Sequence, residues 1–172
     1  MSLQVTAHEV LQATPADVGE IAPLFDLYRQ FYGKTPNEEA ARRLMTIPGI
    51  GVLNATALIA AIGQAESFAR GRDLAAWLGL VPRQITTGGK PRLVGISKRG
   101  NKYLRKLLIH GARAALPTLL EGASPLAGWL RGLVTRMHKN AAVVALANKL
   151  ARIAWAVLRR NETFRFAGTA TA

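Results

Sequence analysis

The sequence LMTIPGIGVLNATALIAAI, residues 44–62, joins two apolar helical stretches through a short turn. Gly49 and Gly51 suit this turn, because glycine adopts positive φ angles and lets another backbone approach closely. The pattern resembles a helix-hairpin-helix, in which free N–H groups of the turn and of the second helix hold a DNA phosphate. A simple turn between two packed helices is the alternative. Either way, the stretch predicts a helical domain.

Apolar residues recur at helical spacing on both sides of this turn, which predicts a mainly α fold. The predicted helices span residues 15–32, 36–45, 52–62, 73–80, 101–116, 125–138 and 141–160. Residues 81–97 break the rhythm with two prolines, a Gly-Gly pair and β-branched residues, which predicts a loop or a short irregular hairpin. Pro117 is expected to end the helix that starts near residue 101.

Positive charge is concentrated in the C-terminal part of the chain, whose formal net charge is +13. Six basic and eight acidic residues precede Leu74, whereas seventeen basic and two acidic residues follow from there onward. Such an excess of like charge repels itself, and a polyanion relieves the repulsion while releasing counterions. Nucleic acid is therefore the favoured partner, and an acidic membrane surface is a distant second.

Several other features restrict the class of protein. The chain has no cysteine and only three scattered histidines, which excludes thiolate zinc sites and disulfides and predicts no metal site. Residues 141–158 are apolar but contain Lys149 and Arg152, which predicts a buried helix and no membrane span. The start of the chain has no signal-peptide pattern. A reducing compartment such as the cytoplasm is therefore expected.

A basic window from residue 83 to residue 106 contains no carboxylate. Lys102, Arg105 and Lys106 are predicted to share one helix face, since residues three and four apart are neighbours. Such a helix can lie against a duplex backbone or along an RNA groove, although a merely solvated face has the same composition. The residues predicted to bind nucleic acid are Gly49, Gly51, Arg83, Lys90, Arg92, Lys98, Arg99, Lys102, Arg105 and Lys106.

Four segments within this region carry a family resemblance. They read PGIG at 48–51, AAWLGLVPRQ at 75–84, TGGK at 87–90 and GISKRGNKYLR at 95–105. Together they resemble the C-terminal transposase domain of the insertion sequence one-ten, one-sixteen and nine-oh-two family, close to its IS-eleven-eleven subgroup. The resemblance covers about residues 42–166, and leaves residues 1–41 as an N-terminal helical extension unlike the family and residues 167–172 as a frayed tail.

The resemblance implies a DNA transposase that pairs this domain with an N-terminal RuvC-like nuclease domain, whose DEDD carboxylates hold magnesium. It also implies a nucleophilic serine in the C-terminal domain, a covalent protein–DNA link like that of serine recombinases, and a structured bridge RNA that selects donor and target DNA. The resemblance further implies a homo-oligomer for the full-length protein and a place in the bacterial cytoplasm, in association with the nucleoid. The position of the family's serine corresponds to Thr87 in this sequence, preceded by Thr86.

This sequence departs from the family pattern in two respects. Threonine keeps a hydroxyl that can attack phosphorus, but its methyl group restricts χ1 and crowds an in-line approach. Three alternatives stay open: Thr87 is a working nucleophile, Thr86 or Ser97 takes over its role, or the loop is inactive. Nothing before Arg42 resembles the nuclease domain, so we expect this chain to need no cofactor of its own and to be inactive alone.

The leading hypothesis is therefore a DNA-binding C-terminal half of an insertion-sequence transposase, acting in transposition and recombination by attack on a DNA phosphodiester. The partners in this hypothesis are the DNA of the element ends, the target DNA and a structured bridge RNA. The alternative is a non-catalytic nucleic-acid-binding remnant of such a transposase. A basic helical structural protein, such as a ribosome-associated factor, is a third class, but it has no need of the motifs at 75–84 and 95–105.

Overall fold

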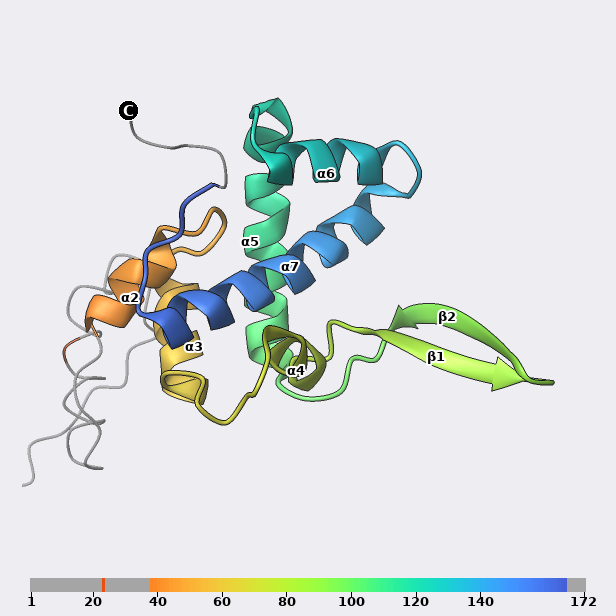
Figure 1. Cartoon of the computed structure of the whole chain (residues 1–172), viewed down its shortest axis with the longest axis horizontal. Coiled ribbons are helices and arrows are strands. Elements are labelled where there is room, and N and C mark those ends of the chain that lie inside the picture. Colours follow the sequence, from red (N-terminus) through yellow and green to blue (C-terminus); the bar gives the residue numbers. More distant parts are fainter. Residues whose placement is uncertain (1–22, 24–37, 167–172) are drawn as a thin grey trace, which may run out of the picture. The chain divides into compact units, whose positions relative to one another are not determined.

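The computed structural model of the protein describes Pro23 and residues 38–166. Over residues 38–166 the chain forms six helices and one two-stranded sheet (Figure 1). The helices are α2 (Glu38–Met45), α3 (Val52–Ile62), α4 (Gly71–Trp77), α5 (Lys102–Glu121), α6 (Pro125–Val134) and α7 (Lys139–Arg160). The predicted mainly α fold is confirmed. The helix predicted over 15–32 and the tail predicted over 167–172 lie outside the described residues.

The core of the domain is centred on α7, which packs against α2, α4, α5 and α6. Its buried side chains are Ala142, Val143, Leu146, Ala147, Leu150, Ala151, Ala154, Val157 and Leu158. By length and composition alone α7 could cross a membrane, yet half of its apolar window is buried inside the domain. This burial is that of a core helix, in agreement with the sequence prediction for residues 141–158.

Helix α2 belongs to this compact unit, which begins at Asn37. Its first-turn carboxylates, Glu38 and Glu39, pair with Arg42 and Arg43 one turn later. The hydrogen bond and the charge of Glu38 raise the pKa of the exposed Arg42 guanidinium. The sequence predicted a domain boundary between residues 41 and 42. That position lies inside α2, and the compact unit includes the whole helix.

Helix α5 runs through Pro117, where the sequence predicted that the helix ends. Proline has no N–H, so the carbonyl of Arg113 loses its helical donor. Leu116 and Leu119, on either side of the proline, are nevertheless buried in the core. Burying side chains of this size contributes about 1.5–3 kcal/mol each, which offsets the lost bond. The helix ends before Gly122, and Ser124 then caps α6 by accepting a hydrogen bond from the Ala127 N–H.

Residues 82–96 form a regular antiparallel hairpin of β1 (Pro82–Thr87) and β2 (Lys90–Ile96), where the sequence predicted a loop or an irregular hairpin. Gly88 and Gly89 have φ angles of +57° and +74°, which fit the two-residue turn that best matches strand twist. The register shifts once, between Pro82 and Arg83. The hairpin extends away from the helices (Figure 1), so its two strands stay accessible on both faces.

Candidate nucleic-acid interface

The hairpin has two chemically different faces. Cross-strand partners share a face, and side chains alternate between faces along each strand. The register pairs Arg83 with Val94 and Thr87 with Lys90. One face, here called the basic face, therefore carries Arg83, Ile85, Thr87, Lys90, Arg92 and Val94. The other, the uncharged face, carries Gln84, Thr86, Pro91 and Leu93.

The candidate hydroxyls Thr86 and Thr87 therefore point to opposite faces of the hairpin. The amide of Gln84 donates a hydrogen bond to the Thr86 hydroxyl over 3.3 Å, which agrees with their placement on the uncharged face. Thr87 ends β1 beside the turn, directly across from Lys90. All residues of β1 are exposed to solvent. Of the two, Thr87 is the hydroxyl that shares its face with cations.

Ser97, the third candidate hydroxyl, lies at the opposite end of the hairpin. Its backbone N–H donates a hydrogen bond to the Val81 carbonyl over 2.9 Å, and the residue is half-buried. Seven residues of extended chain separate Ser97 from Lys90, the cross-strand partner of Thr87. At about 3.3 Å per residue this is roughly 23 Å. Ser97 and Thr87 therefore cannot act on one phosphate in this arrangement.

The base of the hairpin is held by the anchoring loop, residues 97–101, which packs against the end of α4. Gly79, two residues after α4, has a φ of +71°, and an added Cβ there would lie 2.1 Å from the Arg99 carbonyl oxygen. Gly100, with a φ of +83°, has the Trp77 carbonyl oxygen 1.8 Å from such a Cβ position. The backbones therefore approach as closely as only glycine permits at both positions.

Arg105 fixes the same junction from inside, and here the structure differs from the sequence prediction. The side chain is 8% exposed, and its Nη1 donates hydrogen bonds to the carbonyls of Leu78, over 2.9 Å, and Arg99, over 3.0 Å. Carbonyls at the C-terminal end of a helix need such donors. Arg105 is therefore buried at the hairpin base, where it holds two carbonyls in position, and does not lie on the exposed helix face that the sequence predicted.

The remaining cations of the predicted window are exposed. Lys98, Arg99, Lys102 and Lys106 surround the hairpin base, and Arg83 lies at the start of β1. Within residues 38–166 the two ion pairs both join side chains of α2, so no carboxylate of this part neutralises them. The exposed part of the predicted interface is thus a hairpin with one basic face, followed by a basic loop and helix start.

The turn between α2 and α3 brings Gly49 against α5. Gly49 has a φ of +84°, and a Cβ on it would lie 2.5 Å from the Gly111 carbonyl oxygen. The amide of Asn54 donates to the carbonyls of Gly49, over 3.0 Å, and Leu107, over 3.3 Å. Gly51, by contrast, is exposed and has no atom within 4 Å of an added Cβ. Close packing against α5 thus explains why residue 49 is glycine, whereas Gly51 faces open space that a ligand could occupy.

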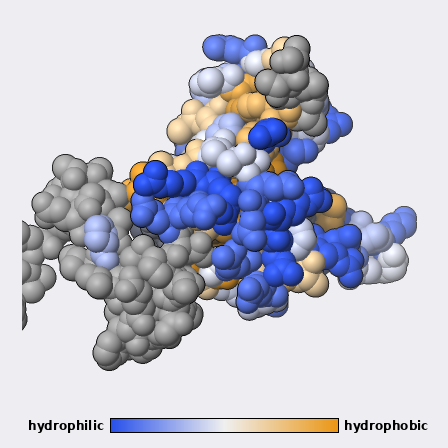
Figure 2. Space-filling view, turned by 60° about the vertical axis from the view of Figure 1, so that its left-hand side comes forward, coloured by the Kyte–Doolittle hydropathy of each residue, from blue (hydrophilic) through white to orange (hydrophobic). Residues whose placement is uncertain are grey.

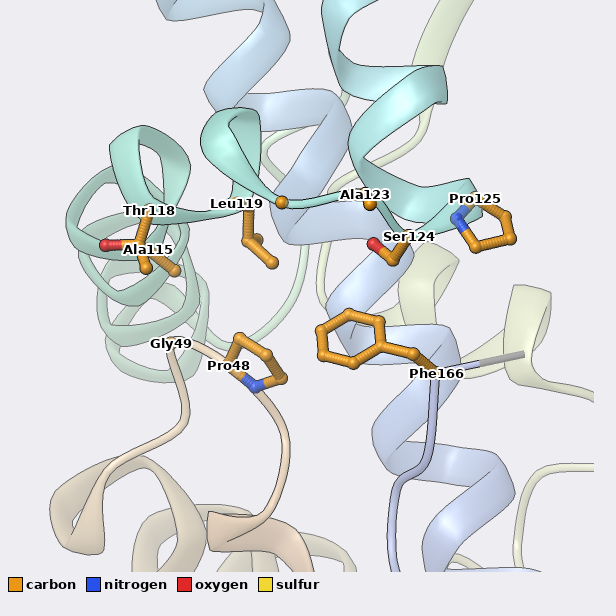
Figure 3. Close-up of a pocket in the computed structure, with 10 residues that line it drawn as sticks. Pro48, Gly49, Ala115, Thr118, Leu119, Ala123, Ser124, Pro125 and Phe166 are labelled. Atoms are coloured by element: carbon orange, nitrogen blue, oxygen red, sulfur yellow. The ribbon is translucent and has the colours of Figure 1, made fainter. Parts of the chain in front are cut away.

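Pro48 and Gly49 also line a pocket of about 900 Å³ (Figure 3). The pocket is bordered by the end of α5, the link to α6 and the ring of Phe166, which points toward Pro48 and Ser124 (Figure 3). No charged side chain is among its lining residues. This side of the turn is therefore suited to apolar packing and not to a phosphate.

Substitutions at the two glycines of the turn are expected to have different effects. Gly49→Ala is expected to lower the free energy of unfolding by about 3 kcal/mol, because it combines a backbone clash with a positive φ. Gly51→Val is expected to stay folded and to bind DNA more weakly, because a bulky side chain would cover the start of α3. Urea denaturation and DNA titration measure the two effects. Unchanged DNA affinity in folded Gly51→Val would leave the turn with a packing role alone.

Carboxylates that could hold magnesium do not gather in the described part of the chain. Over residues 38–166 no three Asp, Glu, His or Cys side chains lie together in a metal-binding arrangement. These residues therefore do not fit the magnesium site that the family resemblance implies. Magnesium stays a prediction for the nuclease domain.

The fold and the hairpin together define a basic helical domain, and comparison with known families identifies it. Residues 41–121, from α2 to the end of α5, match the model described as Transposase IS116/IS110/IS902 family. The chain belongs to this transposase family, as its sequence motifs predicted. The matched residues include the α2–α3 turn, the whole hairpin and the anchoring loop.

Curated relatives support the same assignment. The chain is 44% identical over 163 residues to a probable family 20 transposase of Pseudomonas aeruginosa, covering 88% of this chain and 48% of the relative. It is 45% identical over 139 residues to the transposase for insertion sequence element IS1328 of Yersinia enterocolitica, covering 81% and 42%. It is 50% identical over 127 residues to the transposase for insertion sequence element IS1111A of Coxiella burnetii, covering 74% and 35%. The chain thus spans less than half the length of these relatives.

Proposed function

We propose that this chain is the DNA-binding part of a transposase and that its hairpin presents the Thr87 hydroxyl to a DNA phosphodiester. The observation that carries the proposal is the basic face, where Arg83, Lys90 and Arg92 share one side of the hairpin with Thr87. Cations at this spacing attract a phosphate and neutralise the charge that grows on it during attack. The uncharged face offers Thr86 no such support.

The proposed reaction is a transesterification. The Thr87 Oγ1 forms a bond to phosphorus as its proton leaves, and the bond from phosphorus to the departing DNA oxygen breaks as that oxygen gains a proton. One phosphodiester is exchanged for another, so no energy-supplying cofactor is required. Lys90 and Arg92 stabilise the added negative charge on the phosphate oxygens.

Activation of the hydroxyl needs a group from outside the hairpin. Residues 74–120 contain nine basic side chains and no carboxylate, so this region supplies no carboxylate base near Thr87. We assign that role to the nuclease domain that the family resemblance implies, acting on DNA selected with a bridge RNA in the bacterial cytoplasm. A homo-oligomer is part of the same proposal. The second candidate, a non-catalytic nucleic-acid-binding remnant, is favoured by the methyl group that Thr87 adds beside its hydroxyl.

Exchanging charge on one hairpin face at a time tests the DNA-binding part of this proposal. One variant combines Arg83→Gln, Lys90→Gln and Arg92→Gln, and its matched control combines Gln84→Glu, Thr86→Glu and Leu93→Glu on the uncharged face. Both change the net charge by −3. The basic-face variant is expected to lose on the order of 10–100-fold in duplex affinity, with a salt slope lower by about 3, since each phosphate contact releases counterions.

The uncharged-face control is expected to lose affinity much less, because its new carboxylates point away from the DNA. Fluorescence anisotropy over a series of salt concentrations gives both quantities. Equal losses in the two variants would mean that net charge alone governs binding, and the basic face would then have no special role. Far-UV circular dichroism of the full chain verifies that the helices of each variant are intact.

A further inference from the structure

We infer that α5 carries a second DNA contact, a row of exposed side chains that lies along the duplex flanking the phosphodiester at the hairpin. The row, here called the basic track, consists of Lys102, Lys106, His110 and Arg113. This inference rests on the proposed function and extends it to a surface outside the hairpin. It names the duplex backbone of DNA as the partner of that surface.

Helical geometry places the four residues on one side of α5. Their spacing is four, four and three residues, so they follow one another along a single face. At 1.5 Å per residue the track is about 16 Å long. All four are exposed, whereas Leu104, Leu108 and Ala112 are buried on another side of the helix. The track is therefore a straight surface and not a set of scattered charges.

The track continues beyond α5 at both ends. At one end, Arg113 Nη1 donates a hydrogen bond to the Asn140 side chain over 3.1 Å, which joins the track to the first turn of α7. Exposed Arg136, His138 and Lys139 lie just before that residue. At the other end the track begins directly after the anchoring loop, which holds exposed Lys98 and Arg99. Exposed cations thus precede the track at the hairpin base and follow it at the start of α7.

Two cations outside the track have structural partners of their own. Arg131 donates to the carbonyls of Leu120 and Gly122, both over 2.8 Å, and Lys149 lies 4.5 Å from the ring centre of Trp129. The side chains of Lys102 and Lys106 have no hydrogen bond or ion pair with any residue between 38 and 166. Holding such cations side by side costs repulsion, which a phosphate backbone relieves.

A second surface carries charges of both signs and provides a control. Hydrophilic residues also gather on the side of the molecule that carries α2 (Figure 2). There a groove between α2 and the end of α7, here called the mixed face, is lined by four arginines and two glutamates: Arg42, Arg43, Arg160, Arg165, Glu39 and Glu162. The carboxylates offset part of the positive charge, so the mixed face attracts a polyanion less than the basic track does.

The shape of the track favours duplex DNA over duplex RNA. A straight helix fits the major groove or the backbone of B-form DNA, whereas the deep, narrow major groove of A-form RNA excludes it. The hairpin and the N-terminal half of α7 extend from α5 toward the same side (Figure 1). The Arg113–Asn140 hydrogen bond places the track on that side. One duplex can therefore contact the track and continue to the hairpin.

The experiment compares two double variants of the full chain. Lys106→Gln with Arg113→Gln removes two cations from the track, and Arg160→Gln with Arg165→Gln removes two from the mixed face. Each is titrated with short and long DNA duplexes, of about 8 and about 25 base pairs, at several salt concentrations. The track variant is expected to lose on the order of tenfold in affinity for the long duplex, with a salt slope lower by about 2.

The expected pattern has three further parts. The short duplex, which cannot reach both surfaces, is expected to lose less than threefold, and the mixed-face variant is expected to stay within about twofold throughout. An RNA duplex of the same sequence is expected to bind the track variant and the unmodified chain alike. Hydroxyl-radical footprinting is expected to show a shortened flank with intact protection at the hairpin.

Long-duplex affinity that is unchanged in the track variant would overturn the inference, as would an equal loss in the mixed-face variant. A larger loss for RNA than for DNA would also overturn it, because the partner would then be RNA. The proposed function fails separately, when the basic-face variant of the hairpin keeps its affinity. A chain that depends on the hairpin cations but not on the track keeps the proposed function and loses this inference.

Discussion

Gly100→Ala is expected to lower the free energy of unfolding by about 3–5 kcal/mol, more than any other single change at the hairpin base. An alanine Cβ would lie 1.8 Å from the Trp77 carbonyl oxygen, which belongs to backbone and cannot move away alone. The φ of +83° adds strain, because side chains other than glycine rarely adopt it. Urea denaturation followed by far-UV circular dichroism measures the loss.

Gly88→Ala is the matched control for this change. Gly88 also has a positive φ, +57°, but no atom lies within 4 Å of its added Cβ. The control therefore keeps the backbone strain without the clash, and about 1–2 kcal/mol is expected. A Gly100→Ala protein that loses no more than the control would show that the anchoring loop moves freely. The close approach of the loop to α4 would then be unimportant for stability.

Two of the family motifs have a structural role in addition to the nucleic-acid contact that the sequence predicted. The segments at 75–84 and 95–105 meet at Gly79 and Gly100, where α4 and the loop pack backbone to backbone. Arg105 joins them by donating to a carbonyl from each segment. Some residues of these motifs therefore build the base on which the hairpin stands. The exposed cations between them stay candidates for contact with nucleic acid.

Much of the fold could be predicted because the spacing of apolar residues along the sequence indicates which side of a helix is buried. Helices α2, α3, α6 and α7 begin and end within a few residues of their predicted limits. One apolar face specifies α2, α6 and α7, whereas α3 is a continuous apolar stretch. The Gly-Gly pair between β-branched residues indicated a hairpin. Pro117 was interpreted wrongly, because local propensity cannot register the burial of Leu116 and Leu119 against distant helices.

The candidate site was less predictable, because sequence gives the charge of a residue but not its direction. Arg105 was counted with the exposed cations, although Leu108 and Ala112 stand three and seven residues after it, which is the spacing of a buried face. That signal was present in the sequence. The partner of Gly49 was not, because Gly111 lies on another helix and only the tertiary fold brings it close. The division of the hairpin into two faces required the observed register.

Thr87→Ala is expected to abolish covalent attachment to DNA, by on the order of a thousandfold or more, since the attacking oxygen is removed. The reaction combines the full chain with the nuclease domain, magnesium and the RNA of the element, and uses labelled element-end DNA. A protease-sensitive shifted band on a denaturing gel reports the adduct. Thr87→Ser is expected to keep or increase the adduct, because serine retains the hydroxyl without the crowding methyl group.

The controls for this prediction are Thr86→Ala on the uncharged face and Ser97→Ala at the hairpin base, both expected to keep the adduct. The chain alone is expected to form none, because residues 74–120 offer a hydroxyl and cations but no carboxylate base. An adduct formed by the chain alone, and lost in Thr87→Ala, would overturn the expected inactivity while confirming the nucleophile. An adduct that survives Thr87→Ala but not Ser97→Ala would move the chemistry from the hairpin tip to its base, where Lys98 and Arg99 would then be the cations beside the phosphate.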